Sequence, residues 1–169
     1  ILGLPTGFAD WDRAACGSTG GQVIVIAARP GMGKTACAIQ IAEEHLRRAP
    51  ILFFSLEQPD WEIAERKLAR DTGGRWIRRM AMDGCDGNDL KKLCQAQGQL
   101  GDGFRIATGN LGVSDIVSTA RAEIREHGVG AVFIDQFSHI RRPSGQSQLD
   151  AAYAISRALK KDLALMLDV

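Results

Sequence analysis

The chain has 169 residues, of which 45% are hydrophobic and 24% are charged, and its formal net charge is +1. This length and composition suit one globular domain with its own core, and the near-neutral charge argues neither for nor against a polyanionic partner. No apolar run reaches membrane-spanning length, and the four cysteines form no C-x-x-C pair, so we expect neither a zinc site of that spacing nor a disulfide framework. These observations fit a cytoplasmic protein.

Residues 1–21 are expected to form a segment that leads into the first strand. Pro5 and Gly7 predict a turn, and residues 10–12 can open a short helix. This segment would cover the edge of a sheet or lie beside a nucleotide base, although a plain surface segment explains it equally well.

The stretch from Gln22 to Thr35, QVIVIAARPGMGKT, carries the strongest signal in the chain. It predicts a strand over 22–28, then a glycine-containing turn, then a helix from Lys34. This is the setting of the phosphate-binding loop G-x-x-x-x-G-K-[ST], with Ala28 in place of the first glycine. The alternative, a structural turn that happens to end in Lys-Thr, is the weaker interpretation. The predicted nucleotide-binding residues are Ala28, Arg29, Pro30, Gly31, Met32, Gly33, Lys34 and Thr35.

Backbone geometry explains why such a loop binds phosphate. Where a strand ends and a helix begins, several unpaired N–H groups and the positive end of the helix dipole point into one small space. Gly31 and Gly33 permit backbone angles that a side chain would block. Lys34 would place its ammonium on the β- and γ-phosphates, and Thr35 would give its hydroxyl to Mg²⁺.

The helix that follows the loop is predicted over 34–48. Its apolar residues recur at helical spacing, Arg47 and Arg48 suit the negative end of its dipole, and Pro50 stops it. We expect His45 on the polar margin of this helix.

Residues 51–56, ILFFSL, predict a strand that is buried on both faces of a parallel sheet. The acid that follows, Glu57, would lie at the carboxyl end of this strand, where ligands bind in open α/β sheets. Beside a phosphate-binding loop, Glu57 is placed to polarise the water that attacks the γ-phosphate. The alternative is a carboxylate that only caps the next helix, and we favour the catalytic role.

Residues 59–100 predict helices with breaks near 72–74 and 83–87. They carry a local basic excess that could contact nucleic acid or a neighbouring subunit, but a solvated helix face is the favoured explanation. The basic residues are Arg66, Lys67, Arg70, Arg75, Arg78 and Arg79.

Two further strands are predicted in the second half of the chain. Residues 103–107 form a short strand, and a helix with Ser114 as its N-cap runs to His127, with Gly128 in the left-handed conformation behind it. Residues 130–135, GAVFID, form a buried strand that ends at Asp135. That carboxylate has the position of a Walker B aspartate that holds Mg²⁺; the alternative is a cap on the following turn.

The last predicted helix begins at about Asp150, after a polar loop over 141–148. The alternation of strands and helices calls for another strand after this helix, so we expect one domain over 1–169 that lacks its C-terminal strands.

Five segments in order resemble the C-terminal ATPase domain of bacterial and phage replicative DNA helicases of the DnaB type, within the RecA-like P-loop class. They are LPTGF with Asp10, the Walker A segment ARPGMGKT, FFSLEQ, the Walker B segment VFID and ISRALK. The resemblance implies a RecA-like α/β fold with a mostly parallel central sheet flanked by helices. It also implies that Glu57 is the catalytic base, that Lys34 acts on the phosphates, and that Thr35 and Asp135 hold Mg²⁺.

The resemblance further implies an Mg²⁺–ATP-driven hexameric ring on single-stranded DNA, with primase and a helicase loader as further partners. A neighbouring subunit would supply an arginine finger, so we expect the isolated chain to bind ATP weakly and to hydrolyse it poorly. The chain departs from the family's Tyr-Leu-Gln after the Walker B acid, where Gln136, Phe137, Ser138 and then His139 stand. No DNA-binding residue is assigned.

Three rival interpretations remain open at this point. A RecA-like recombinase or clock-type ATPase would share the fold, and a small-molecule phosphotransferase would need a lid for which Arg141 and Arg142 are thin support. A degenerate nucleotide-binding assembly module would bind ATP and oligomerise without turnover, and the changed residues 136–139 keep that interpretation in play.

Overall fold

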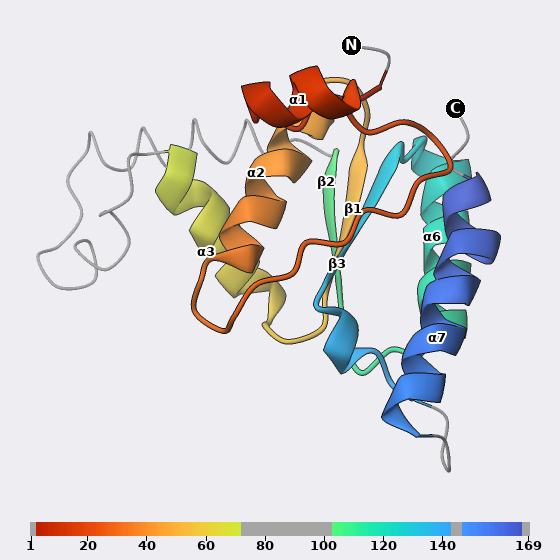
Figure 1. The fold of residues 1–169 in the computed structure, drawn as a ribbon. Helices are drawn as coiled ribbons and strands as arrows, with labels where there is room; N and C mark the ends of the chain where they lie inside the picture. The colour runs from red at the N-terminus through yellow and green to blue at the C-terminus, as the bar shows by residue number, and fades with distance from the viewer. Residues whose placement is uncertain (1–2, 72–102, 143–146, 167–169) are drawn as a thin grey trace, which may run out of the picture.

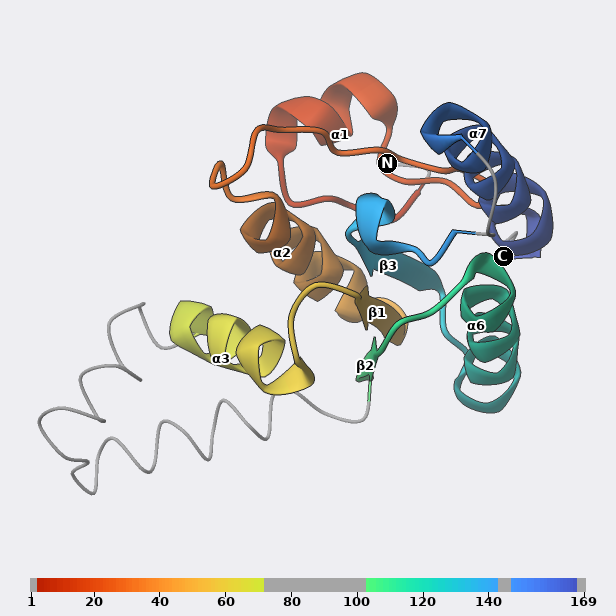
Figure 2. The same cartoon turned by 90° about the horizontal axis from the view of Figure 1, so that it is seen from below.

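The computed structural model describes residues 3–71, 103–142 and 147–166. Three parallel strands form its sheet in the order β2-β1-β3: β1 is Ile51–Ser55, β2 is Phe104–Thr108 and β3 is Ala131–Asp135. Helices cover both faces of this sheet (Figures 1 and 2). The α/β class and the parallel sheet are therefore confirmed, and all three strands lie where the sequence places them.

The helices follow the strands in two layers. Helices α2 (Lys34–Leu46) and α3 (Asp60–Asp71) lie on one side of the sheet, and α6 (Val113–His127) and α7 (Gln148–Ala158) lie on the other (Figure 1). The shorter elements are α1 (Ala9–Ala15), η1 (Phe137–His139), η2 (Leu159–Leu163) and η3 (Ala164–Met166). No helix in the described ranges is long and apolar enough to cross a membrane.

The central strand β1 joins two hydrophobic cores. All five of its residues are buried, as a strand covered on both faces requires. Leu52 and Phe54 belong to the core that includes α6, α7 and η2, whereas Ile51 and Phe53 belong to the core that includes α2 and α3. The ring of Phe53 stacks between Phe104 and Phe133, with both centroid distances at 6.0 Å. This packing fixes the three strands relative to one another.

The predicted strand over 22–28 is wrong. The segment belongs to no strand, and Figure 1 shows it as a loop that crosses from the side of α7 to the start of α2. Its apolar residues Val23, Ile24, Val25 and Ile26 remain 39% to 77% exposed. Strand preference reflects packing against ladder neighbours, and this segment pairs with no described strand, so its sequence pattern alone does not produce one.

The start of α6 also differs from the prediction. The helix is capped by Gly112 rather than by Ser114, and the Asp115 side chain accepts a hydrogen bond from the Gly112 N–H at 2.8 Å. An acidic side chain in the first turn satisfies an unpaired N–H and matches the positive end of the dipole. The prediction for Gly128 is confirmed, because this residue follows the helix with φ of 66°.

His45 is buried, which corrects its expected place on the polar margin of α2. Its ring lies against Phe133, with ring centroids 5.6 Å apart, and neither ring nitrogen has a hydrogen-bond partner among the described residues. Burial lowers the pKa of His45, because the charged imidazolium loses its hydration; nearby Asp12 and Glu44 oppose this effect.

The basic residues of α3 are not all on a solvated face. Lys67 is buried and its Nζ lies 3.7 Å from the Glu43 carboxylate of α2, which Arg70 also contacts at 2.5 Å. Glu43 thereby ties the two helices together. Arg75, Arg78 and Arg79, and the helices predicted over 72–100, lie outside the described residues.

Candidate functional site

The loop before α2 contains two glycine backbone conformations that suit a phosphate-binding loop. Gly31 and Gly33 adopt left-handed angles, with φ of 77° and 87°, which L side chains rarely adopt. Helix α2 begins directly afterwards at Lys34, so its unpaired N–H groups face the loop. The Lys34 ammonium donates to the carbonyl oxygens of Ala28 and Arg29 at 3.2 Å and 3.4 Å. The loop's own carbonyls thus hold the charge at the helix N-terminus, where a phosphate would compete for it.

Thr35 and Asp135 meet although 100 residues separate them in the chain. The Thr35 hydroxyl donates to Asp135 Oδ2 at 2.7 Å, and Asp135 is buried at the end of β3. A hydroxyl and a carboxylate form the hard oxygen pair that Mg²⁺ prefers, and Mg²⁺ usually completes its shell with phosphate oxygens and water. The donor set therefore fits Mg²⁺, and the structure brings together the two residues that the sequence nominates for it.

Glu57 lies just beyond the end of β1. The bond from Leu56 N to Asp135 O, at 2.8 Å, extends the pairing of β1 and β3 by one residue and carries Glu57 to the turn after β3. Its carboxylate is 48% exposed and lies 3.9 Å from His139 Nδ1. No hydrogen bond or ion pair joins Glu57 to Lys34 or Thr35 in the described part of the chain, so the structure places it at the same sheet edge without direct contact.

A cleft of about 360 Å³ opens at this edge of the sheet. It is formed by the carboxyl ends of β1 and β2 and by the turn after β3, which is where open α/β sheets bind their ligands. The lining residues are Ser55, Leu56, Glu57, Gln58, Pro59, Thr108, Gly109, Asn110 and His139. The cleft places Glu57 at the wall of a space that a water molecule or a phosphate can enter.

Arg141 holds the turn after β3 against the loop after β2. Its backbone N–H donates to Leu111 O at 2.8 Å, and its guanidinium bonds Asn110 O at 3.2 Å and Asp115 Oδ2 at 2.8 Å. These bonds hold the side chain on the scaffold, so Arg141 gives no support for a phosphotransferase lid.

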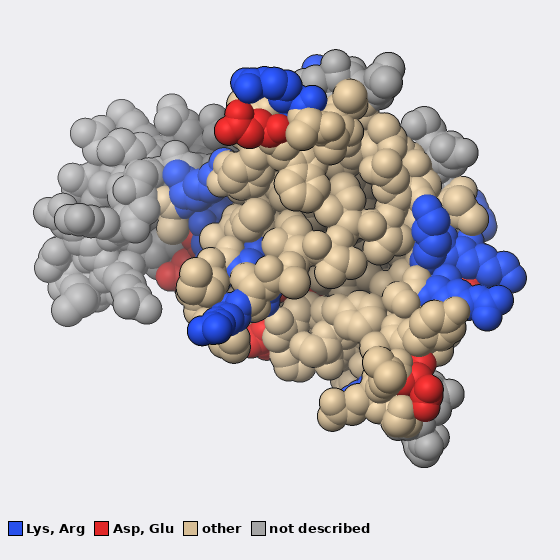
Figure 3. Space-filling model, viewed as in Figure 1, with Lys and Arg blue, Asp and Glu red and all other residues tan. Residues whose placement is uncertain are grey.

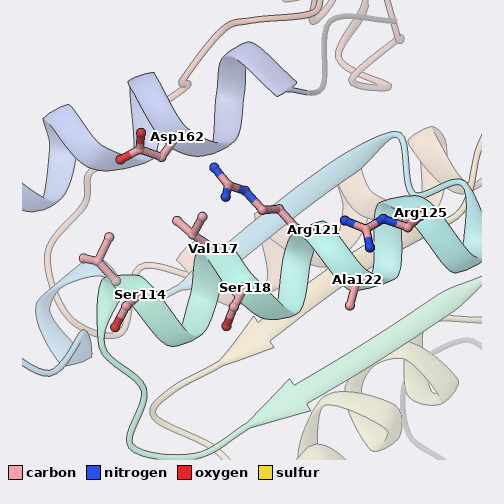
Figure 4. Close-up of a pocket in the computed structure, with 8 residues that line it drawn as sticks. Ser114, Val117, Ser118, Arg121, Ala122, Arg125 and Asp162 are labelled. Atoms are coloured by element: carbon pink, nitrogen blue, oxygen red, sulfur yellow. The ribbon is translucent and has the colours of Figure 1, made fainter.

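A second hollow, of about 630 Å³, lies over α6 and η2, away from the predicted site residues (Figure 4). Arg121 and Arg125 extend over it from α6, opposite Asp162 of η2. Figure 3 shows Lys and Arg gathered at the edge of the molecule that α6 and α7 occupy in Figure 1. Lys160 and Lys161 of η2 are exposed. None of the predicted catalytic residues lines this hollow, so it is separate from the candidate site.

Sequence reasoning nominated Lys34, Thr35, Glu57 and Asp135, but it treated His139 only as a departure from a pattern. A histidine four residues after a strand-ending acid was the available signal. The η1 turn brings it back toward the neighbouring strand end, and this requires the three-dimensional turn rather than the sequence spacing alone.

The matches to known proteins agree with this geometry. Residues 3–169 match the family described as DnaB-like helicase C terminal domain. The chain belongs to this family. It is 33% identical over 166 residues to the replicative DNA helicase DnaB of Geobacillus stearothermophilus, covering 95% of this chain and 36% of that protein. It is 35% identical over 170 residues to DnaB of Rhodothermus marinus, covering 95% of this chain and 18% of that protein.

Solved structures show the same fold. A solved structure described as an ATPase domain superposes with a TM-score of 0.90 at 29% identity, over 100% of this chain and 62% of that chain. A DnaB-like replicative helicase, described together with its interactions with primase, superposes with a TM-score of 0.89 at 30% identity. The superposition covers 100% of this chain and 42% of that chain. The RecA-like ATPase fold of this helicase family is therefore shown. The chain spans about a third or less of the length of the curated relatives given above.

Proposed function

We propose that this chain is the motor domain of a replicative DNA helicase, which hydrolyses Mg²⁺–ATP between subunits to translocate on single-stranded DNA and unwind duplex. The observation that carries the proposal is the 2.7 Å bond between Thr35 and Asp135, next to a glycine-rich loop that starts a helix at Lys34. This bond joins the two segments that resemble Walker A and Walker B, which supports a shared site for nucleotide and metal. Membership of the DnaB-like family supports the DNA-unwinding role.

Each residue has a distinct part in the proposed reaction. The loop N–H groups at the start of α2 bind the phosphates, and Lys34 exchanges its bonds to Ala28 and Arg29 for the β- and γ-phosphate oxygens. Glu57 accepts a proton from the attacking water at the end of β1. Thr35 and Asp135 would hold Mg²⁺, which when bound neutralises the charge that develops on the phosphates.

We also propose the partners and the compartment that this function implies. The full-length protein would assemble as a hexameric ring around single-stranded DNA in the cytoplasm, with a neighbouring subunit completing each ATP site. One DnaB-like helicase is described together with its interactions with primase, and we propose primase and a helicase loader as partners here. On this account the isolated chain binds nucleotide weakly and turns it over slowly. The domain would extend over 1–169 and continue into further C-terminal strands.

Unwinding of a forked DNA duplex by the full-length protein tests the helicase function. We expect ATP-dependent strand separation by the wild type and none by Lys34→Ala, which loses the phosphate-binding ammonium. The matched control Lys161→Ala removes an exposed lysine of η2, outside the loop, and should leave unwinding unchanged. DNA-stimulated ATP turnover without strand separation would favour a recombinase-type ATPase, and phosphate transfer to a metabolite would favour a phosphotransferase.

A further inference from the structure

The carboxylate of Glu57 has one interaction partner in the described part of the chain, and that partner is His139. The two side chains are about equally exposed, at 48% and 44%, and Glu57 Oε2 lies 3.9 Å from His139 Nδ1. A half-exposed glutamate without a restraint samples several rotamers, whereas a general base must keep its oxygen within hydrogen-bond reach of one water. A group that limits the motion of Glu57 therefore bears directly on catalysis.

The position of His139 is fixed by the turn that carries it. The short helix η1 is closed by bonds from His139 N to Gln136 O at 3.0 Å and from Ile140 N to Phe137 O at 3.3 Å. Ile140, which follows at once, is 2% exposed and belongs to the core between the sheet and α6. The backbone of His139 is thus anchored, and only its side chain needs orientation.

Gln136 supplies that orientation. Its amide nitrogen lies 3.3 Å from the same Nδ1 atom that faces Glu57. A proton on Nδ1 is attracted by the Glu57 carboxylate. Because an amide nitrogen only donates, the Gln136 amide then turns its oxygen toward the ring and accepts from the same Nδ1–H. At 3.9 Å the contact with Glu57 is longer than a direct hydrogen bond, and it acts through charge or through a bridging water.

We propose that His139, oriented by Gln136, is a positioning residue that holds the Glu57 carboxylate for attack of water on the γ-phosphate. The proposal rests on the function proposed above and deepens it. Residues 136–139, which depart from the family's Tyr-Leu-Gln pattern, then serve the ATP site of this chain, and their change does not mark a degenerate module.

Steady-state ATP hydrolysis by the full-length protein on single-stranded DNA tests the proposal. We expect His139→Ala to lower kcat by about 10- to 100-fold, because a misplaced catalytic group typically costs that much, and to leave KM for ATP within about twofold. His139→Asn should keep most of the wild-type rate, since its amide nitrogen can occupy the place of Nδ1. In a Glu57→Gln background, His139→Ala should have no further effect, because the two residues act as one unit.

His127 provides a matched control. Its ring is 39% exposed, and its Nε2 atom also lies 3.9 Å from carboxylates, those of Glu123 and Glu126, at the far end of α6. We expect His127→Ala to have wild-type kcat.

A second readout needs no turnover. His139→Ala should bind Mg²⁺–ADP normally but bind Mg²⁺–ADP–aluminium fluoride about 10-fold more weakly, because only the latter imitates the transferring phosphate with its attacking water.

The outcomes separate this inference from the proposed function. Wild-type turnover that is lost in Glu57→Gln but is unchanged in His139→Ala would overturn the role of His139 and leave the motor function standing. If His139→Ala lowers kcat by the same factor in the wild type and in the Glu57→Gln background, the role of His139 is also overturned, because the effect would then be structural. A wild type without turnover would overturn the proposed function, and this inference with it.

Discussion

At the scale of single residues, the candidate site is built from groups that already hold one another. Lys34 is bound by two loop carbonyls, Thr35 is bound by Asp135, and Glu57 faces His139. Each contact joins segments that are distant in the sequence or places a charge at a strand or helix end. A nucleotide with its metal would replace the carbonyl partners of Lys34 with phosphate oxygens and the Thr35–Asp135 bond with bonds to the metal, whereas His139 would keep its contact with Glu57, so binding requires little rearrangement of the scaffold.

Asp135→Asn tests the metal site at this scale. We expect the affinity for ATP measured with Mg²⁺ to fall by about 10- to 100-fold, because a neutral amide is a poorer ligand for a hard cation than a carboxylate. The affinity measured in excess chelator should match that of the wild type. Asp10→Asn is the control, since the Asp10 side chain is 96% exposed in α1 and pairs with Arg13 at the surface. Equal affinities for Asp135→Asn and wild type in Mg²⁺ would contradict the assignment.

His45 gives a prediction about pH. The pKa of His45 is lowered from 6.5 in the folded state. As the pH falls below 6.5, His45 therefore becomes protonated in the unfolded chain before it does so in the folded chain. This contribution therefore lowers the free energy of unfolding as the pH falls from about 6.5, by at most about 1.4 kcal/mol per pH unit. Asp12, whose pKa is lowered from 3.8 mainly by its hydrogen bond from the Thr6 backbone, acts only at more acidic pH.

Chemical denaturation of His45→Phe between about pH 5 and pH 7 checks this account. Phenylalanine keeps a ring against Phe133 and removes the two unpartnered nitrogens. We expect the variant to be more stable than wild type at the acidic end of this range and to show a flatter dependence on pH. A pH dependence as steep as that of wild type would show that another group is responsible.

At the scale of elements, the sequence prediction was accurate where neighbouring residues determine the structure and failed where contacts between distant segments determine it. Strands β1 and β3 are nearly continuous apolar runs, and β2 is a short run that Arg105 interrupts. Gly128 ends α6, as a glycine in that position commonly does. The segment 22–28 has an equally apolar pattern, but a strand also needs a ladder partner, which no sequence window contains. The burial of His45 and the pairing of Lys67 likewise depend on neighbours from other elements.

The candidate site divides in the same way. Lys34 and Thr35 are fixed by a local motif, and Glu57 and Asp135 follow from their places at strand ends, so all four could be named before the fold was known. The proximity of Thr35 to Asp135 arises only when α2 packs on β3. The proximity of His139 to Glu57 arises only when β1 and β3 pair in register, Ser55 opposite Asp135. Residues that are brought together only by such contacts cannot be identified from their spacing in the sequence.

Glu43 supplies a prediction for the contact between α2 and α3. Glu43→Gln should lower the free energy of unfolding by about 3 kcal/mol, because it removes the charge opposite the buried ammonium of Lys67. Glu44→Gln is the matched control on the same helix, since Glu44 pairs with the exposed Arg47 and such surface pairs contribute less than about 1 kcal/mol. Urea denaturation of both variants measures the difference, and equal losses would contradict the linking role of Glu43.

At the scale of the whole molecule, the chain is a RecA-like unit whose proposed ATP site lies at the carboxyl edge of its sheet. Family membership and fold are shown by the matches and the superpositions, whereas turnover, ring assembly and DNA contact are proposals for the full-length protein. Under the proposed function, the ATP site is complete only when a neighbouring subunit contributes its arginine finger. The molecule should then couple hydrolysis to assembly on DNA.

ATP hydrolysis by the full-length protein, with and without single-stranded DNA and beside a Glu57→Gln variant, tests this central claim most directly. We predict turnover that DNA stimulates and that Glu57→Gln abolishes while it still binds ATP, since the general base contributes about 10²- to 10⁴-fold to the rate. Nucleotide binding and assembly without turnover in the wild type would contradict the motor account and support a nucleotide-binding assembly module instead.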